Sequence, residues 1–156
     1  MRYLMERLID TPVQVVSDLG DLLAQNAEAD ALLGTVCQVQ GEARNIVWNW
    51  FANPVLRELY SEEEWVESGR HLVADLRAAV GRRGADAEAR DLVERLRARS
   101  PQFATLWAQH EVGVQRSRLI RLPKGQVRQR ADAVEYQVET LLTPAADQRL
   151  LLFTTA

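Results

Sequence analysis

The chain has 156 residues, 47% hydrophobic and 26% charged, which indicates one globular domain over 1–156 and excludes a mainly disordered segment. The net charge of −3 argues against nucleic-acid binding by the whole domain, and a single cysteine, Cys37, excludes an internal disulfide or a cysteine-based zinc site. No apolar run is long enough to span a membrane and no signal peptide is recognisable, so we expect a cytoplasmic domain.

The N-terminal part is predicted to form a helix followed by a β-hairpin. Apolar residues at helical spacing predict a helix over 2–9, which ends before Pro12. Residues 12–16 and 21–26 are predicted to be two strands, joined by a turn over 17–20.

The middle of the chain is predicted to be helical, with recognisable start signals. Asn26, Ser61 and Ser100 are favourable N-caps, and Ser61 is followed by three glutamates that suit the first turn of a helix. Pro101 follows Ser100 as a proline at the first helical position, and Gly34 suits the end of the first of these helices. The predicted helices cover 27–33, 42–52, 54–60, 62–81, 86–99 and 101–110.

The last third is predicted to form strands. Residues 134–142 alternate between apolar and polar side chains, as expected for a half-buried antiparallel strand, and 119–122, 127–131 and 150–154 are also predicted strands. Strands at both ends of the chain with helices between them predict an α+β domain with one sheet covered on one face.

No catalytic or metal-binding motif is present, so we predict no catalytic residue and no metal site. His71 and His110 have no paired nucleophile in the sequence, and position 114 is valine where a zinc helix beginning at His110 would need a ligand. Cys37 has no nearby basic partner, so it is interpreted as a packing thiol.

Two groups of residues leave alternatives open. The basic run could contact phosphates or an acidic ligand, or it could pair across a hairpin with Glu135 and Glu139. It consists of Arg116, Arg118, Arg121, Lys124, Arg128 and Arg130. The aromatic group could be core, or it could line an apolar cavity. It consists of Trp48, Trp50, Phe51, Phe103 and Trp107.

An ordered series of segments along nearly the whole chain resembles the MmyB-like ligand-binding domain of XRE-type helix-turn-helix bacterial transcription regulators. The most specific segment is ARSPQFATLWAQHEV at 98–112. The others are 11–16, 23–26, 44–45, 57–60, 72–77, 135–141 and 147–150. Two places depart from the family pattern: Leu23 stands where a tryptophan is usual, and Arg118 with 122–125 replaces a lysine and a His-Pro-x-x-Gly stretch.

The resemblance implies a PAS-like fold, in which a small antiparallel sheet and a central run of helices enclose an apolar cavity for a fatty-acid-like molecule. It implies an effector-sensing role without enzymatic activity and without a cofactor other than such a ligand. Residues 1–11 are too few for a helix-turn-helix, so we expect DNA to be contacted only by a domain outside this chain. Regulators of this kind bind DNA as dimers, so a homodimer is expected.

The candidate ligand-binding residues combine aromatic walls with an anchor for a carboxylate, because a buried carboxylate needs a cation or several donors. The walls are predicted to be Trp48, Phe51, Phe103 and Trp107, and the preferred anchors are Arg44 and His110. Arg57 and Arg99 are weaker candidates for the anchor. The alternatives are a dimerisation module with a filled core and no ligand, and a small His-dependent enzyme.

Overall fold

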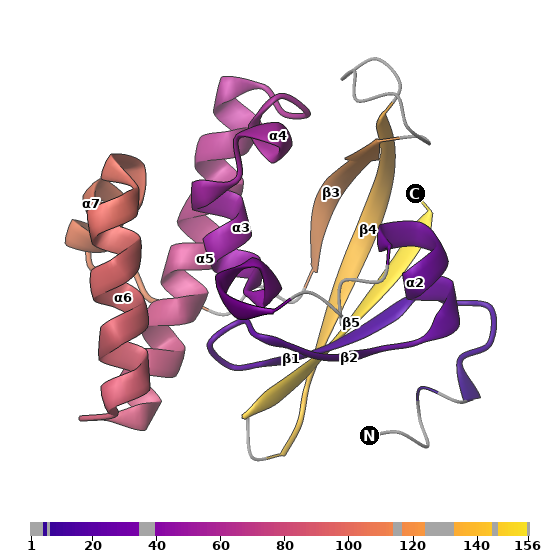
Figure 1. The fold of residues 1–156 in the computed structure, drawn as a ribbon, viewed down its shortest axis with the longest axis horizontal. Helices are drawn as coiled ribbons and strands as arrows, with labels where there is room; N and C mark the ends of the chain where they lie inside the picture. Colours follow the sequence, from indigo (N-terminus) through magenta and orange to yellow (C-terminus); the bar gives the residue numbers. More distant parts are fainter. Residues whose placement is uncertain are drawn as a thin grey trace.

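A computed structural model describes residues 5, 7–34, 40–113, 117–123, 133–144 and 147–155 (Figure 1). The predicted α+β class is confirmed: one antiparallel sheet lies beside a layer of helices. Cys37, the predicted strand at 127–131, most of the predicted helix at 2–9, and Arg116, Lys124, Arg128 and Arg130 lie outside the described residues. None of the helices within the described residues is both long enough and apolar enough to cross a bilayer.

The sheet has five strands in the order β2-β1-β5-β4-β3, and all neighbouring strands are antiparallel. The strands are β1 (Val13–Ser17), β2 (Leu22–Gln25), β3 (Ser117–Pro123), β4 (Ala133–Leu142) and β5 (Gln148–Thr155). β3 is therefore an edge strand, and in Figure 1 it stands beside α4 and α5.

The helices between the two halves of the sheet lie beside it, and the first of them stands apart from the others (Figure 1). They are α2 (Ala27–Leu33), the 3-10 helix η2 (Gly41–Arg44), α3 (Ile46–Ala52), α4 (Pro54–Arg57), α5 (Glu62–Arg83), α6 (Ala87–Arg99) and α7 (Pro101–Ala108). The three predicted N-caps are confirmed: the side chains of Asn26, Ser61 and Ser100 accept hydrogen bonds from the first turns of α2, α5 and α7.

The predicted single helix over 42–52 is wrong, because the chain breaks at Asn45. This buried residue has an extended backbone, and its side-chain oxygen accepts from the main-chain N–H groups of Val47 and Trp48. Its amide nitrogen donates to the carbonyl of Leu19 and to Asp21, each at 3.0 Å. Contacts with a residue 26 positions earlier thus hold Asn45 as the cap of α3, which local spacing could not indicate.

Two predicted helix ends also differ from the structure. α5 continues through Gly81 to Arg83 and ends at Gly84, whose φ of 64° is the left-handed conformation that glycine adopts readily. α7 ends at Ala108, two residues before His110, which has φ of 58°. His110 therefore lies beyond the helix and outside the face that carries Phe103 and Trp107.

Aromatic side chains form the centre of the helical layer. Trp50 stacks on Trp65 with ring centroids 4.0 Å apart, and Tyr60 meets Trp50 edge-on at 4.8 Å. Gly69 permits this packing, because a Cβ at that position would lie 3.2 Å from the Trp50 ring nitrogen and 3.3 Å from Phe51. A second part of the same layer surrounds Phe103, whose side chain is fully buried.

Candidate functional site

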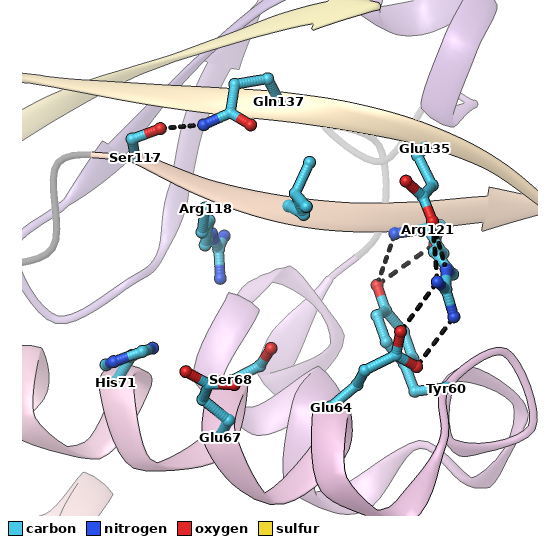
Figure 2. A pocket seen from close by; sticks show the side chains of 11 residues that line it. Tyr60, Glu64, Glu67, Ser68, His71, Ser117, Arg118, Arg121, Glu135 and Gln137 are labelled. Carbon is cyan, nitrogen blue, oxygen red and sulfur yellow. Dashed lines mark hydrogen bonds and ion pairs between the residues drawn. The ribbon is translucent and has the colours of Figure 1, made fainter. Parts of the chain in front are cut away.

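A cavity of about 390 Å³ lies between α5 and the edge strand β3; we call it the α5–β3 cleft (Figure 2). Its helical wall is one face of α5, since the lining residues recur at the spacing of helical turns. These are Glu64, Glu67, Ser68 and His71, with Tyr60 just before the helix. The opposite wall consists of Ser117, Arg118, Leu119 and Arg121 of β3 with Glu135 and Gln137 of β4.

At one end of the cleft, Arg121 is fully paired. Its guanidinium is 2.7 Å from both Glu64 and Glu135, and the hydrogen bond to Glu135 is the main reason why the pKa of Arg121 is raised. The Tyr60 hydroxyl accepts from the Arg121 main-chain N–H at 2.9 Å and lies 3.2 Å from the Arg121 carbonyl. Burial raises the pKa of Tyr60. This end is a closed polar contact between α5 and the sheet.

Arg118, three residues earlier on β3, is in a different situation. Its side chain is half-buried and reaches from β3 toward α5, on the side of His71 and away from Arg121 (Figure 2). Within the described residues, no side chain or carbonyl accepts a hydrogen bond from its guanidinium. Burial lowers the pKa of Arg118, although an arginine remains protonated at neutral pH. The cleft therefore contains a desolvated positive charge that has no partner among the residues the structure describes.

Behind Arg118 and His71 lies a small inner chamber of about 30 Å³, enough for a water molecule or a single polar group. The chamber shares both residues with the α5–β3 cleft, so the two spaces adjoin. Its apolar surface comes from Val16, Ile46, Leu72 and Leu151. Its polar surface includes Asp75 and Arg149, which form a buried ion pair that leaves Asp75 Oδ1 and Arg149 Nε without partners.

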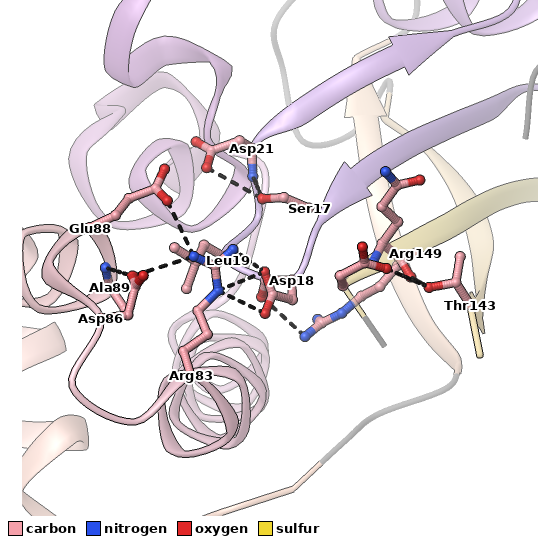
Figure 3. A network of polar contacts seen from close by, with 12 residues as sticks. Ser17, Asp18, Leu19, Asp21, Arg83, Asp86, Glu88, Ala89, Thr143 and Arg149 are labelled. Carbon is pink, nitrogen blue, oxygen red and sulfur yellow. Dashed lines mark hydrogen bonds and ion pairs between the residues drawn. The ribbon is translucent and has the colours of Figure 1, made fainter. Parts of the chain in front are cut away.

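A buried polar network connects this ion pair with the far end of α5 (Figure 3). Arg149 donates to the main-chain carbonyl of Asp18 at 3.2 Å, and the Asp18 carboxylate accepts from Arg83 at 2.7 Å. Arg83 also pairs with Asp86 and Glu88 at the start of α6. The hydrogen bond to Asp18 is the main cause of the raised pKa of Arg83. The β1–β2 turn is thus attached to both β5 and the helical layer.

The two predicted carboxylate anchors lie away from the cleft. Arg44 donates to the main-chain carbonyl of Leu22 at 2.5 Å, so its guanidinium already has a structural partner. His110 is exposed and follows the end of α7. Arg57, a weaker candidate, pairs with Glu62. A ligand contact for Arg44 or His110 stays a prediction.

The four predicted aromatic walls mostly pack against each other. Phe51 meets Phe103 edge-on at 5.3 Å, and Phe103 stacks on Trp107 at 5.6 Å, so the structure brings these three together as predicted. The Arg77 guanidinium covers the Trp107 ring at 3.9 Å. Of the four, only Trp48 lines one of the three cavities described here, a separate pocket of about 210 Å³ beside Arg95. A ligand role for the other three stays a prediction.

Sequence reasoning noticed Arg118 only as a member of the basic run and as a departure from the family pattern. His71, for which the sequence indicated no catalytic partner, lines both the cleft and the inner chamber. The signal that could have singled out Arg118 is register: Arg121 lies opposite Glu135, whereas Arg118 lies opposite the apolar Val138. The predicted pairing of the basic run with Glu135 thus holds for Arg121 and not for Arg118.

The described residues contain no group of three or more histidine, cysteine, aspartate or glutamate side chains placed to hold a metal ion. Ser68 and His71 are neighbours on one face of α5, but within the part of the chain that the structure describes no hydrogen bond joins the serine hydroxyl to the imidazole. Through such a bond a neighbouring base takes the proton of a serine nucleophile. The arrangement can bind and orient a small molecule through Arg118, and it shows no catalytic pair.

Among curated proteins, no relative matches this chain. Among solved structures, it is similar over 100% of both chains to the crystal structure of the PAS domain of a protein from Desulfitobacterium hafniense, with 13% sequence identity and a TM-score of 0.36. The family model described as "MmyB-like transcription regulator ligand binding domain" matches residues 1–156. The chain therefore belongs to the family of MmyB-like transcription regulator ligand-binding domains.

Proposed function

We propose that this chain is an effector-sensing domain that binds a small carboxylic acid in the α5–β3 cleft, with Arg118 as the anchor of the carboxylate. The observation that carries the proposal is the half-buried Arg118 guanidinium, which faces a cavity of about 390 Å³ and has no partner among the described residues. The volume is within the range of small-molecule sites, which runs from about 300 to 1,000 Å³.

Electrostatics favours an anionic ligand at this position. A charge that is partly removed from water and left unpaired is costly, and a carboxylate that binds it with two parallel hydrogen bonds offsets that cost. The acidic side chains Glu64 and Glu135 do not supply this partner, because both contact Arg121 at the other end of the cleft. Arg118 is therefore the arginine of the cleft that is available to the ligand's carboxylate, because Arg121 is already paired with Glu64 and Glu135.

The proposed ligand class remains fatty-acid-like, with its acid end at Arg118 rather than at Arg44 or His110. Family membership supports a ligand-sensing role, and DNA would be contacted by a separate domain. We also propose that the domain works as a cytoplasmic homodimer and is not an enzyme; the unbonded Ser68 and His71 support the second point.

Binding of undecanoic acid and of its methyl ester, measured by calorimetry, tests the proposal. We expect the acid to bind more tightly than the ester. Arg118→Gln should lower the affinity for the acid by roughly 10- to 150-fold, the equivalent of about 1.5–3 kcal/mol for hydrogen bonds between charged groups. The ester should be insensitive to the substitution. The contribution of Arg118, measured as the difference in affinity between the wild-type protein and Arg118→Gln, should be constant between pH 6 and 8, because arginine does not titrate there.

Arg44→Gln and His110→Ala are matched controls, because they remove the two anchors that the sequence predicted. Both should leave the affinity for the acid within about twofold, since Arg44 bonds a main-chain carbonyl and His110 is exposed. Equal affinity of the wild-type protein for acid and ester would refute the proposal. A loss caused by His110→Ala, together with weaker binding as the pH rises through about 6.5, would instead place the anchor at His110.

A further inference from the structure

The wall of the α5–β3 cleft contains main-chain hydrogen-bonding groups that have no partner among the described residues. β3 is an edge strand of the described sheet, so one of its two edges has no neighbouring strand there. At Arg121 this edge is occupied, because the Tyr60 hydroxyl bonds both the N–H and the C=O of that residue. The main-chain groups of Arg121 therefore point away from β4 and toward α5.

Antiparallel pairing fixes the direction of the neighbouring groups. In such a ladder, residues that bond the partner strand alternate with residues whose N–H and C=O point outward. Leu119 is two residues before Arg121 and lies opposite Gln137, so its N–H and C=O also point away from β4. Leu119 lines the cleft, and within the described residues no group is bonded to its main chain on that side. Among the described residues, the cleft thus presents a donor and an acceptor without partners, on the residue that follows Arg118.

We infer that the ligand is an α-amido acid, in which the carboxylate and a secondary amide nitrogen are attached to the same carbon atom. The amide N–H would donate to the Leu119 carbonyl, and the carboxylate would accept from the Leu119 N–H and from Arg118. This is the pairing that one residue of an added strand makes with one residue of an edge strand. The inference rests on the proposed function and deepens it by naming the group beside the acid.

The cleft offers hydrogen-bonding groups in addition to apolar surface, which fits a ligand that has a polar group beside its apolar chain. Ser68, Ser117 and Gln137 line the cleft together with the charged side chains at its two ends. A purely aliphatic chain would leave the main-chain groups of Leu119 without partners once water is displaced, which costs free energy. Two sources have the required chemistry: an N-acylated amino acid, and the C-terminal residue of a short peptide.

Four probes test the inference with the intact domain. N-octanoylglycine carries the amide donor, N-octanoylsarcosine replaces the amide hydrogen with a methyl group, and undecanoic acid has the same chain length without the amide. The fourth probe, the tripeptide Ala-Ala-Ala, represents the peptide source. We expect N-octanoylglycine to bind about 5-fold more tightly than both N-octanoylsarcosine and undecanoic acid, as one additional hydrogen bond predicts. Tighter binding of the tripeptide than of N-octanoylglycine would assign the ligand to peptides.

A main-chain variant locates the effect. Leu119→Pro removes the N–H that points into the cleft without removing a bond to β4, and proline is tolerated on such an edge. It should weaken N-octanoylglycine about 5-fold, whereas Leu119→Ala, which keeps the N–H, should change affinity less than twofold, since the Leu119 side chain is 54% exposed. If the proline variant does not fold, the sarcosine comparison still decides.

The outcomes separate the two proposals. Equal affinities for N-octanoylglycine, N-octanoylsarcosine and undecanoic acid, with Ala-Ala-Ala no tighter, would overturn the α-amido acid and leave the Arg118 site standing. Failure of all four probes to bind would overturn the proposed function and the inference with it.

Discussion

Two adjacent regions of the molecule differ in how their space is filled. One is the α5–β3 cleft, and the other is the aromatic centre of the helical layer, which consists of Trp50, Phe51, Tyr60, Trp65, Phe103 and Trp107. In the aromatic centre, Phe103 is fully buried and its contacts with Phe51 and Trp107 occupy the space that a ligand would need. In the cleft, about 390 Å³ stays open between polar and charged side chains that also contribute apolar surface. The difference shows that aromatic residues at helical spacing fill space efficiently, whereas a cavity remains where an edge strand and a helix are joined by polar contacts at only one end.

Tyr60 belongs to both regions and marks their boundary. Its ring packs edge-on against Trp50 in the aromatic centre, and its hydroxyl bonds the main chain of Arg121 at the closed end of the cleft. Tyr60 therefore connects the aromatic centre with β3 at the closed end of the cleft.

The largest expected effect is in the aromatic centre. Phe103→Ala should lower the free energy of unfolding by about 3–5 kcal/mol, because it removes a fully buried ring and leaves a cavity among well-packed neighbours. Urea denaturation followed by circular dichroism measures it. Leu119→Ala in the cleft is the matched control and should change stability by less than about 0.5 kcal/mol. A loss below 1 kcal/mol for Phe103→Ala would show that this region is not the core.

The second-largest loss of stability is expected at the Asp75–Arg149 ion pair, which lines the inner chamber. Arg149→Ala should cost about 3 kcal/mol, the lower end of the range for breaking a buried pair, because the Asp75 side chain remains 16% exposed. The double variant Arg149→Met with Asp75→Leu should recover most of that loss, since no buried charge is left unpaired. The same denaturation experiment checks both. A double variant as unstable as Arg149→Ala would mean that the hydrogen bond to the Asp18 carbonyl carries the effect.

The sequence was informative where structure is determined locally. The caps at Asn26, Ser61 and Ser100 follow from a side chain and the next three residues, and all three form as predicted. The alternation along β4 predicted that strand for the same reason. Asn45 breaks a predicted helix because its partners, Leu19 and Asp21, are more than 20 residues away, and helical periodicity contains no information about them.

The site was predicted less well because its walls come from distant parts of the chain. α5 contributes residues near 64–71 and the β3–β4 hairpin contributes residues near 117–137, so only tertiary packing makes them neighbours. The sequence also could not separate Arg118 from Arg121, since both belong to one basic run. Their difference depends on whether Glu64 and Glu135 reach them, which is a property of the packed structure.

The boundary residue Tyr60 should show a smaller effect with a distinctive pH dependence. Tyr60→Phe keeps the ring and removes two hydrogen bonds, so we expect a loss of about 1–3 kcal/mol at neutral pH. Because burial raises the pKa of Tyr60, the folded protein keeps the phenol proton at pH values where the unfolded chain has lost it. This contribution to stability is present below about pH 10, the usual value for tyrosine, and is lost as the pH rises through the raised pKa.

Denaturation at several pH values between 8 and 11 measures this dependence. The wild-type protein should lose stability above pH 10, and the part of that loss caused by Tyr60 should be absent in Tyr60→Phe. Identical slopes for the two proteins would show that the hydroxyl ionises as freely in the folded chain as in the unfolded one.

The smallest expected effect concerns ligand affinity, and it decides between the two regions as the binding site. If Trp107 lined the ligand cavity, as the sequence predicted, Trp107→Ala would weaken binding by about 1–3 kcal/mol. In the structure Trp107 stacks on Phe103, the Arg77 guanidinium lies over its ring, and it is not among the residues that line the α5–β3 cleft. We therefore expect Trp107→Ala to lower stability while changing the affinity for undecanoic acid by less than twofold. Calorimetric titration at a temperature where the variant is fully folded measures the affinity. A tenfold loss, with Arg118→Gln binding normally, would transfer the site to the aromatic centre, because a distant tryptophan can affect binding that strongly only by contacting the ligand or by reshaping its pocket.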